Sequence, residues 1–356
     1  MSEGGLETLL REMCAREASD LLLTAGTPPQ FRIHGFLKAA ESLPLDAATT
    51  RALAHSLLDP QQLERLTRER TLDFSRGIAG LARFRFNVYF QRDAVALAVR
   101  RLPFTLPRFA DLGLPPVVRE FASRPHGLVL ITGPAGSGKS TTLAALIDDI
   151  NQTRRVHIVC IEDPIEFLHA HRLSVVDQRE IGEDALSFAE ALRSVFRQSP
   201  DVIMVGEMRD LETMRLAMSL AETGHLILAT LHTQDATHAV NRIVDAFPPE
   251  QQAQVYAQLS LVLAGVVAQQ LLPTADGRGR VAACEVLNVN NAIRNLIREG
   301  QLQQLYSVIQ TGRAEGMVTM NDALKALYDA GAIDFDTAMS RSPRPKELAR
   351  LMPMRR

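Results

Sequence analysis

A glycine-rich segment between residues 127 and 142 contains the residues best suited to chemistry. Its letters, GLVLITGPAGSGKSTT, include the spacing G-x-x-x-x-G-K-S. Glycines let backbone N–H groups converge on an anion, because a Cβ would block that approach. An apolar run precedes the loop and a pattern of helical period follows it, so a helix N-terminus would face the same anion. The segment predicts a phosphate-binding loop for a nucleotide, formed by Gly133, Pro134, Ala135, Gly136, Ser137, Gly138, Lys139, Ser140 and Thr141.

Two side chains of this loop have specific tasks. Lys139 is expected to reach the β- and γ-phosphates, and the Ser140 hydroxyl to bind Mg²⁺. ATP and Mg²⁺ are therefore the expected ligands. The alternative is a chance glycine loop without a ligand, which requires strand, loop and helix to coincide by accident.

Carboxylates follow two later apolar runs. Glu162 and Asp163 close the run VHIVCIED, Glu166 follows it, and Glu207 closes DVIMVGE. Carboxylates beside a polyphosphate would repel it unless they serve Mg²⁺ or polarise water. Glu207 has the Walker B arrangement and is expected to hold the metal through water or to orient the attacking water. For the first group, ordinary helix-cap and turn carboxylates around Pro164 are the alternative.

Two histidines bracket the next apolar run, GHLILATLH. His232 ends it, at the edge of the sheet where ligands bind, so its side chain is expected to touch the γ-phosphate. His225 opens the same run and is a second candidate. For both, the alternative is a histidine that serves only the fold.

Arginines outside the loop are candidates for stabilising the charge that phosphoryl transfer leaves on the transferred group. Arg85, Arg92 and Arg100 lie in or beside strands expected in the first hundred residues. That region could present them to a nucleotide on a neighbouring subunit. The alternative is an arginine on a solvated strand face.

The elements that must position these residues divide the chain. Residues 1–100 mix helices with alternating strands, including one strand at 31–36 and a helix at 45–66 that Pro60 interrupts, which suggests a small α+β domain. Residues 101–116 are rich in proline and read as a linker. Apolar runs between helical segments then indicate buried parallel strands at 127–132, 156–163, 201–207 and 224–232. Beyond Pro248 we expect helices, including the apolar stretch 255–272, with one short strand at 281–287.

Composition limits the classes of protein to which this chain can belong. The chain has 356 residues and a net charge of −2, which argues against wholesale binding of nucleic acid or a bilayer. No apolar run approaches the roughly 18 residues that a membrane span needs. Only three cysteines occur, far apart, so neither a disulfide framework nor a thiolate zinc site is supported. We expect a cytoplasmic protein in a reducing environment.

Four segments resemble, in order, the Walker A, Asp box, Walker B and His box of secretion and pilus ATPases: GPAGSGKSTT, IEDPIEFLH, RQSPDVIMVGEMRD and TGHLILATLHT. The segment AIRNLIREG at 292–300 and the segment SDLLLTAGTPPQFRIHG at 19–35 resemble the PilT retraction ATPases of type IV pili. The resemblance covers roughly residues 1–340. The chain lacks the cysteine quartet that assembly and secretion ATPases usually carry, which favours retraction.

The resemblance implies an α/β protein with a PAS-like N-terminal domain (1–100), a linker (101–116), a RecA-like P-loop ATPase domain with C-terminal helices (117–340) and a basic tail (341–356). It also implies a ring of six subunits. Glu162, Glu166 and Glu207 would share metal binding and water activation, with Glu166 or Glu207 as general base. His225 and His232 would be the His-box pair. We expect the tail to be solvated or loosely docked.

The retraction motif and the partners also follow from the resemblance. Retraction, rather than hydrolysis, would need Ala292, Ile293, Arg294, Asn295, Leu296 and Ile297. The alternative for the apolar members is the buried face of a helix. The implied partners are the inner-membrane platform protein of the pilus and, as a further option, a second retraction ATPase, which would place the ring at the inner face of the cytoplasmic membrane. Two alternatives stay open: an accessory ATPase like PilU, and a nucleotide-gated binding protein with little turnover.

Overall fold

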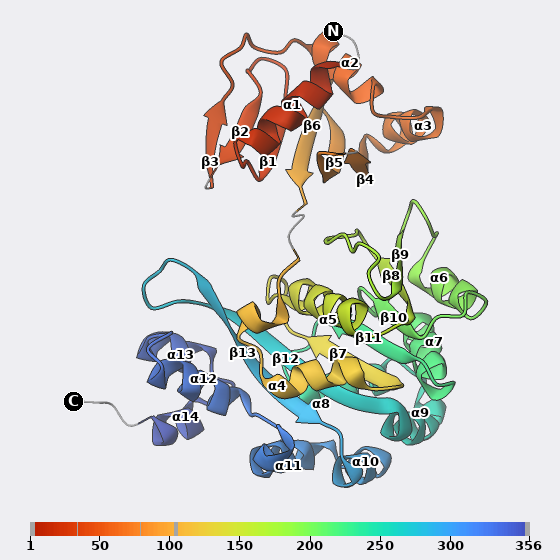
Figure 1. Ribbon diagram of the computed structural model, residues 1–356, viewed down its shortest axis with the longest axis vertical. Coiled ribbons are helices and arrows are strands. Elements are labelled where there is room, and N and C mark those ends of the chain that lie inside the picture. Colours follow the sequence, from red (N-terminus) through yellow and green to blue (C-terminus); the bar gives the residue numbers. More distant parts are fainter. Residues whose placement is uncertain (1–3, 34, 79, 103–105, 353–356) are drawn as a thin grey trace. The chain divides into compact units, whose positions relative to one another are not determined.

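The computed structural model describes residues 4–33, 35–78, 80–102 and 106–352. The chain divides into two compact units, each built around its own sheet (Figure 1). The first contains the described residues of 1–105 together with 164–168, and the second contains residues 106–163 and 169–352. The expected α/β fold is confirmed.

The first unit is a mixed sheet-and-helix domain. Its sheet has the order β3-β2-β1-β6-β5-β4, with antiparallel neighbours. Along β5 the side chains alternate, so that Phe84, Phe86 and Val88 are buried and the residues between them are not. Its elements are α1 (Gly4–Ala15), β1 (Asp20–Leu23), β2 (Gln30–Ile33), β3 (Phe36–Ala39), α2 (Ala47–His55), α3 (Pro60–Glu69), β4 (Thr71–Ile78), β5 (Ala82–Gln91) and β6 (Ala94–Arg101).

Turn chemistry corrects two expectations here. The strand expected at 31–36 ends earlier, at Ile33, because the chain reverses near Gly35 and forms the hairpin β2–β3. The helix expected at 45–66 is two helices. Pro60 is the first residue of α3, where its missing N–H costs no hydrogen bond, and Asp59 caps that helix in a capping box with Gln62.

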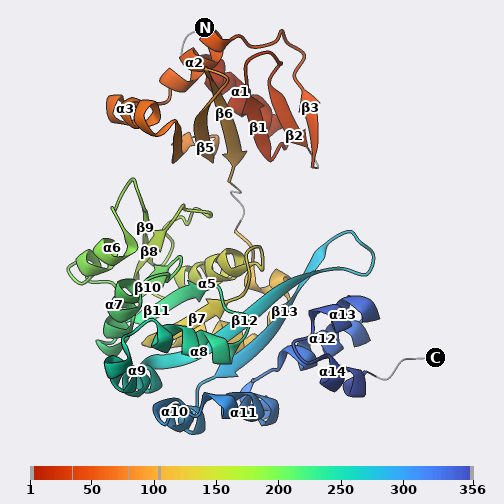
Figure 2. The same ribbon diagram turned by 180° about the vertical axis from the view of Figure 1, so that it is seen from behind.

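The second unit has a sheet with the order β13-β12-β7-β11-β10-β8-β9, in which only β13 runs antiparallel to its neighbour. The inner strand β7 is buried on both faces. Leu128 and Leu130 pack into one hydrophobic core, and Val129 and Ile131 into the other. Figures 1 and 2 show helices on both faces of this sheet.

The strands of the second unit are β7 (Gly127–Thr132), β8 (His157–Glu162), β9 (Val175–Glu180), β10 (Val202–Val205), β11 (Leu226–Leu231), β12 (Leu263–Pro273) and β13 (Arg280–Asn288). Its helices are η1 (Phe109–Leu112), α4 (Pro116–Glu120), η2 (Phe121–Ser123), α5 (Lys139–Thr153), α6 (Phe188–Val195), α7 (Leu211–Glu222), α8 (Ala236–Asp245), α9 (Pro249–Val262), α10 (Asn291–Arg298), η3 (Leu302–Gln304), α11 (Leu305–Thr311), η4 (Arg313–Glu315), α12 (Met320–Asp329), α13 (Phe335–Arg341) and α14 (Pro345–Leu351).

Two strands of this sheet depart from the sequence expectation. The stretch 255–272 is helical only as far as Val262 and then continues as β12, which pairs in parallel with β7. An apolar run alone does not distinguish a buried helix from a buried strand. The sequence does not predict β9, because its letters VVDQRE carry four polar residues and it lies at the edge of the sheet.

The linker and the tail are partly outside the described residues. Residues 103–105 of the predicted linker are not described, and its remainder contains η1 and the first residue of α4. Residues 353–356 of the tail are likewise outside. The expectation of a loosely docked tail is wrong for α14, since Leu348 is fully buried and the Arg344 guanidinium lies 3.6 Å from the ring centroid of Tyr306. The Tyr306 hydroxyl donates to Glu347 at 2.6 Å.

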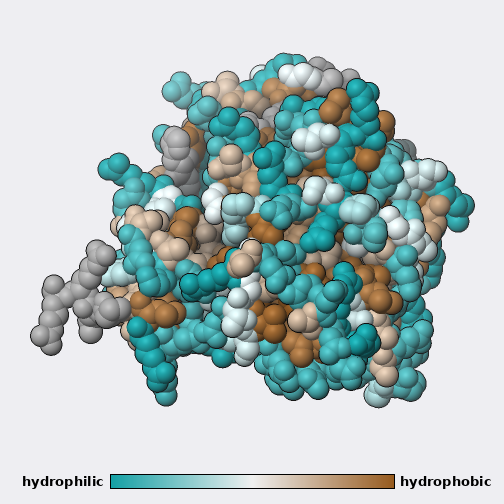
Figure 3. All heavy atoms as spheres, turned by 60° about the horizontal axis from the view of Figure 1, so that its bottom comes forward, coloured by the Kyte–Doolittle hydropathy of each residue, from teal (hydrophilic) through white to brown (hydrophobic). Residues whose placement is uncertain are grey.

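The surface is largely polar. In Figure 3 hydrophilic side chains cover most of the visible face, with hydrophobic ones in small groups between them. Among the helices of the described residues, none combines the length and the apolar content that crossing a bilayer requires.

Candidate active site

The glycine-rich loop follows β7 directly and leads into α5. Gly133, Gly136 and Gly138 have φ angles of 146°, 76° and 89°, a region that favours glycine. Space excludes a side chain at two of them. A Cβ on Gly133 would meet the Gln269 carbonyl oxygen at 2.3 Å, and one on Gly138 would meet Gln269 Nε2 at 2.7 Å. The loop therefore has the backbone that the motif predicts.

Lys139 is the first residue of α5 and is almost completely buried. Its Nζ donates to the carbonyl oxygens of Gly133, at 2.9 Å, and Pro134, at 3.0 Å. These contacts hold the ammonium group across the inside of the loop. Pro134, Ala135 and Gly136, at the apex, are exposed. A positive charge beneath an open backbone turn at a helix N-terminus is suited to phosphate.

Glu207 and His232 come together at the carboxyl ends of neighbouring strands. Glu207 follows β10, and only 13% of its side chain is exposed. His232 Nε2 lies 3.3 Å from a carboxylate oxygen of Glu207, and Arg209 Nε donates to that oxygen at 2.7 Å. The Thr230 hydroxyl donates to the Gly206 carbonyl, and Met208 N donates to Thr230 O at 3.1 Å, so the ends of β10 and β11 are fixed to each other.

Glu162 is the last residue of β8 and is buried. Gln178 Nε2, on β9, donates to its carboxylate at 2.9 Å. The register pairs Glu162 with Glu180, a second buried carboxylate, for which the sequence carries no signal because the letters of β9 do not predict a strand. Paired residues of parallel strands face the same side of a sheet. Glu166 lies four residues after Glu162, in the segment 164–168 of the first unit, and its catalytic role stays a prediction.

His225 is not brought to this edge. It precedes β11, at the amino end of the strand that His232 follows, so the two histidines are separated by roughly 20 Å at the usual strand rise. Its Nδ1 lies 3.0 Å from the Leu220 carbonyl and 3.2 Å from the Thr223 hydroxyl, at the C-terminus of α7. The structure thus places His225 at the end of a helix and apart from His232, and its catalytic role stays a prediction.

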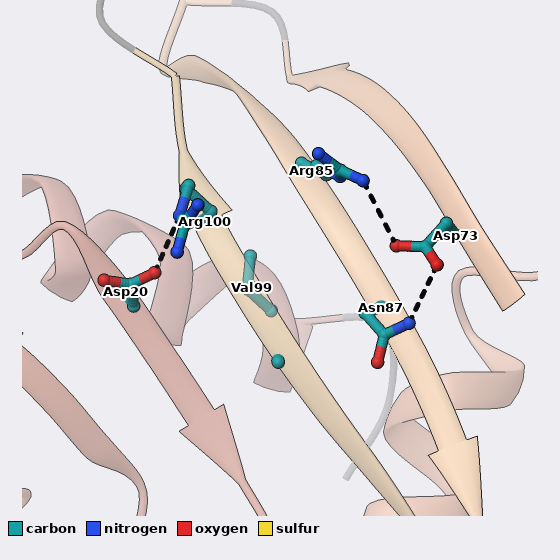
Figure 4. A pocket seen from close by; sticks show the side chains of 7 residues that line it. Asp20, Asp73, Arg85, Asn87, Val99 and Arg100 are labelled. Atoms are coloured by element: carbon teal, nitrogen blue, oxygen red, sulfur yellow. Dashed lines mark hydrogen bonds and ion pairs between the residues drawn. The ribbon is translucent and has the colours of Figure 1, made fainter. Parts of the chain in front are cut away.

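The candidate arginines lie on the sheet of the first unit. Figure 4 shows Arg85 and Arg100 directed at carboxylates: Arg85 lies 3.8 Å from Asp73, and Arg100 donates to Asp20 at 2.9 Å. These residues line a pocket of about 290 Å³ together with Asn87, Ala98 and Val99. Arg92 is exposed at the turn between β5 and β6, with a φ of 46°. Their action on a neighbour's nucleotide stays a prediction.

The segment 292–297 lies entirely within helix α10. Ile293 and Ile297 are fully buried, as the alternative of a simple core helix expects. Arg294 has a separate contact, because its guanidinium donates to the carbonyls of Ser260, at 2.8 Å, and Leu261, at 2.5 Å. These carbonyls belong to the last turn of α9, where a cation is favoured.

A pocket of about 510 Å³ adjoins the loop. Gly138, Thr141 and Thr142 form the wall on the side of the loop, and Arg278 and Arg280 lie at the β12–β13 hairpin. The other lining residues are Asp111, Leu112, Leu114, Gln269, Leu271, Gly279 and Ala282. This volume lies within the range of small-molecule sites. Sequence reasoning gave no signal for it, because its walls come from three distant segments.

Residues 96–333 match the family described as Type II/IV secretion system protein. The chain is 44% identical over 338 residues to the type IV pilus retraction ATPase PilT of Pseudomonas aeruginosa, covering 95% of this chain and 98% of that protein. It is 40% identical to the type IV pilus ATPase PilU of the same organism, covering 97% of this chain and 90% of that protein. A crystal structure of the pilus retraction motor PilT with bound ADP superposes with a TM-score of 0.90 at 50% identity, covering 96% and 98% of the two chains.

Proposed function

Since the chain belongs to the family of type II/IV secretion system proteins, we propose that it is an ATP-hydrolysing motor that retracts type IV pili. The observation that carries this proposal is the likeness to PilT over nearly the whole length of both chains, with a phosphate-binding loop, Glu207 and His232 at the carboxyl ends of neighbouring strands. The chain is an ATPase, and its likeness to an ADP-bound motor supports nucleotide binding.

The loop binds the triphosphate, and the strand ends provide the hydrolytic groups. Lys139, held across the loop, stabilises the charge of the β- and γ-phosphates. A ring N–H of His232 donates to the Glu207 carboxylate and fixes its orientation beside the γ-phosphate. Glu207 then orients the attacking water. The general base is Glu166 or Glu207, and the contact with His232 favours Glu207.

Mg²⁺ fits this set of donors. Ser140 offers a hydroxyl and Glu207 a carboxylate that acts through water, and a magnesium ion at a nucleotide usually takes its other ligands from phosphate and solvent. A dedicated protein cage is not required, and the described residues contain no group of three or more acidic, His or Cys side chains that could form one. The bound ion would neutralise charge on the phosphates.

The ribose and base occupy the pocket beside Thr141 and Thr142. This pocket adjoins the first turn of α5 through Thr141 and Thr142, and in the proposed complex the α-phosphate leaves the loop at this point. Within the described residues the side chains of Arg278 and Arg280 have no anionic protein partner, and a guanidinium stacks well on a purine face. The leucines that line the pocket supply the apolar contact.

Six copies form the ring, with domain boundaries near residues 100, 116 and 340. ATP closes the N-terminal domain of one copy against the P-loop domain of the next, and Arg85, Arg92 or Arg100 completes the neighbour's site. Hydrolysis reopens the interface, because the two states differ in their affinity for ATP and ADP. The ring acts on the pilus platform protein at the inner face of the cytoplasmic membrane, alone or with a second retraction ATPase.

A PilU-like accessory role is the second candidate, favoured by the 40% identity to PilU. A nucleotide-gated binding protein with little turnover is a third. Turnover separates the motor from the last of these. Lys139→Ala and Glu207→Ala should abolish ATP hydrolysis by the purified ring, and a wild-type ring without measurable turnover would reject the motor.

Retraction is tested separately from hydrolysis. Arg294→Ala removes the cap on the last carbonyls of α9 but touches neither the loop nor the strand ends. We expect ATP hydrolysis close to that of the wild type and loss of twitching in a cell whose own retraction ATPase is deleted. Equal loss of hydrolysis and twitching would return α10 to the role of a core helix.

A further inference from the structure

We infer that Gln269 is a positioning residue that holds the phosphate-binding loop in its nucleotide-binding conformation. The inference rests on the proposed function and extends it to a residue outside every motif of the sequence. Gln269 lies on β12 and is 3% exposed. A glutamine amide carries two donors and one acceptor, so a buried one requires partners of both kinds.

The two ends of the Gln269 side-chain amide form hydrogen bonds to residues on either side of Gly138 in the sequence. Nε2 donates to the backbone carbonyl of Ser137 at 2.8 Å, and Oε1 accepts from the hydroxyl of Thr142 at 2.8 Å. The carbonyl can only accept, so it determines which end of the amide faces it. The side chain therefore connects the last turn of the loop to the first turn of α5.

The backbone of Gln269 also lies close to the same loop. β12 pairs with β7 so that Ala268 is opposite Thr132, which brings Gln269 level with Gly133. Its carbonyl oxygen and its Nε2 occupy the space that a Cβ on Gly133 or Gly138 would need. The glycines of the motif thus make room for Gln269 as well as for phosphate.

These contacts have a consequence for nucleotide affinity. Phosphate binding requires the N–H groups of the loop to point inward together. If the Ser137 carbonyl loses its donor, the peptide that connects Ser137 to Gly138 is free to rotate, and the Gly138 N–H turns with it. Replacing Gln269 should therefore lower the affinity of the folded loop for phosphate.

The test measures binding of ADP and of inorganic tripolyphosphate to the full-length chain by titration calorimetry. Gln269→Met keeps the length of the side chain and removes both bonds. We expect the Kd of both ligands to rise about threefold to tenfold, the equivalent of a typical hydrogen bond or slightly more. The matched control is Gln270→Met, because Gln270 is the next residue, points to the opposite face of β12 and donates to the Arg341 carbonyl at 3.3 Å.

A second variant and a double-mutant cycle distinguish a residue that positions the loop from one that only supports the fold. Thr142→Val keeps the shape of the side chain and removes one of the two bonds, and the double variant with Gln269→Met should bind ADP no worse than Gln269→Met alone. In Gln269→Glu the deficit relative to the wild type should shrink as pH falls, because the introduced carboxyl group regains a donor when it is protonated. If Gln269 only supports the fold, its substitution should lower the melting temperature and the bound stoichiometry and leave the Kd unchanged.

Kd values for Gln269→Met and Thr142→Val within twofold of the wild type would overturn the inference while the proposed function stands. Fold-changes that multiply in the double variant would also overturn it. If Gln269→Met fails to fold, Thr142→Val and Gln269→Glu decide by the same criteria. A wild-type chain that binds neither ADP nor ATP would instead overturn the proposed function, and this inference with it.

Discussion

The hydroxyl of Thr132 and the backbone of Thr233 bind each other at two points. Thr132 Oγ1 accepts from the Thr233 N–H at 2.9 Å and lies 2.7 Å from the Thr233 carbonyl oxygen. Thr132 is the last residue of β7, directly before Gly133, and Thr233 directly follows His232. The phosphate-binding loop and the segment that carries His232 are thus held together by one buried side chain.

Replacing this hydroxyl should cost both stability and activity. Thr132→Val keeps the shape but leaves the Thr233 N–H without its acceptor, which we expect to cost about 1–3 kcal/mol of unfolding free energy. Displacement of His232 should lower kcat more than it raises the KM for ATP. Denaturant unfolding and steady-state ATP hydrolysis measure the two effects. Thr132→Ser retains the hydroxyl and serves as the control, and an equally impaired Ser variant would refute the hydrogen-bond explanation.

Two glycines of the loop should respond differently to alanine. At Gly133 the added methyl group would collide with the Gln269 carbonyl at 2.3 Å, so Gly133→Ala should abolish ADP binding. At Gly136 nothing lies within 4 Å, and only the φ of 76° opposes a side chain, at a cost of about 1–2 kcal/mol. Gly136→Ala should therefore fold and bind ADP with reduced affinity. Calorimetric titration of both variants decides, and equal affinities would contradict the steric argument.

His169 should make stability depend on pH. Burial lowers the pKa of this histidine from 6.5 to about 4, and the carboxylate of Asp148 opposes the shift only in part. Between pH 6.5 and 4 the unfolded chain binds a proton that the folded chain does not, so this residue removes stability as pH falls through that window, by at most about 3 kcal/mol. His169→Gln should flatten that slope in denaturant unfolding. The exposed His238→Gln should not, and identical slopes for wild type and His169→Gln would contradict the prediction.

Complementation tests the trans arginines. If Arg92 completes a neighbour's site, rings of Arg92→Ala alone and of Lys139→Ala alone should both be inactive. Equal mixing should restore up to about a quarter of the interfaces, each with one intact loop and one intact arginine. ATP turnover against mixing ratio gives the readout. Absence of rescue at every ratio would count against Arg92, and Arg85 and Arg100 can be tested in the same way.

The strand–loop–helix core could be predicted because its signals are local. The strand β7 spans Gly127–Thr132, the same residues as the apolar run that predicts it. Glu207 and His232 meet because parallel strands end at one edge of a sheet. His225 shows the limit of that reasoning. A histidine at the start of a strand and one at its end are close in sequence but lie at opposite edges of the sheet.

The residues that the sequence did not reveal act through long-range pairing. Gln269 lies in an apolar stretch that could equally have been a helix, and its importance appears only when β12 pairs with β7. Glu180 depends in the same way on β9, an edge strand with little hydrophobic pattern. The local sequence specifies which residues form the loop, whereas the order of the strands determines which distant residues support the loop.

The pairing of β7 with β12 also bears on how the chain is made. The strand before the loop is synthesised early, while its neighbour at Leu263–Pro273 leaves the ribosome only after β8, β9, β10 and β11. Until then an apolar strand edge and the glycine loop lack the wall that supports them, and such edges are where nascent chains misassemble. Premature termination of translation between β11 and β12 would release a chain that carries every nucleotide-binding motif and has no finished pocket.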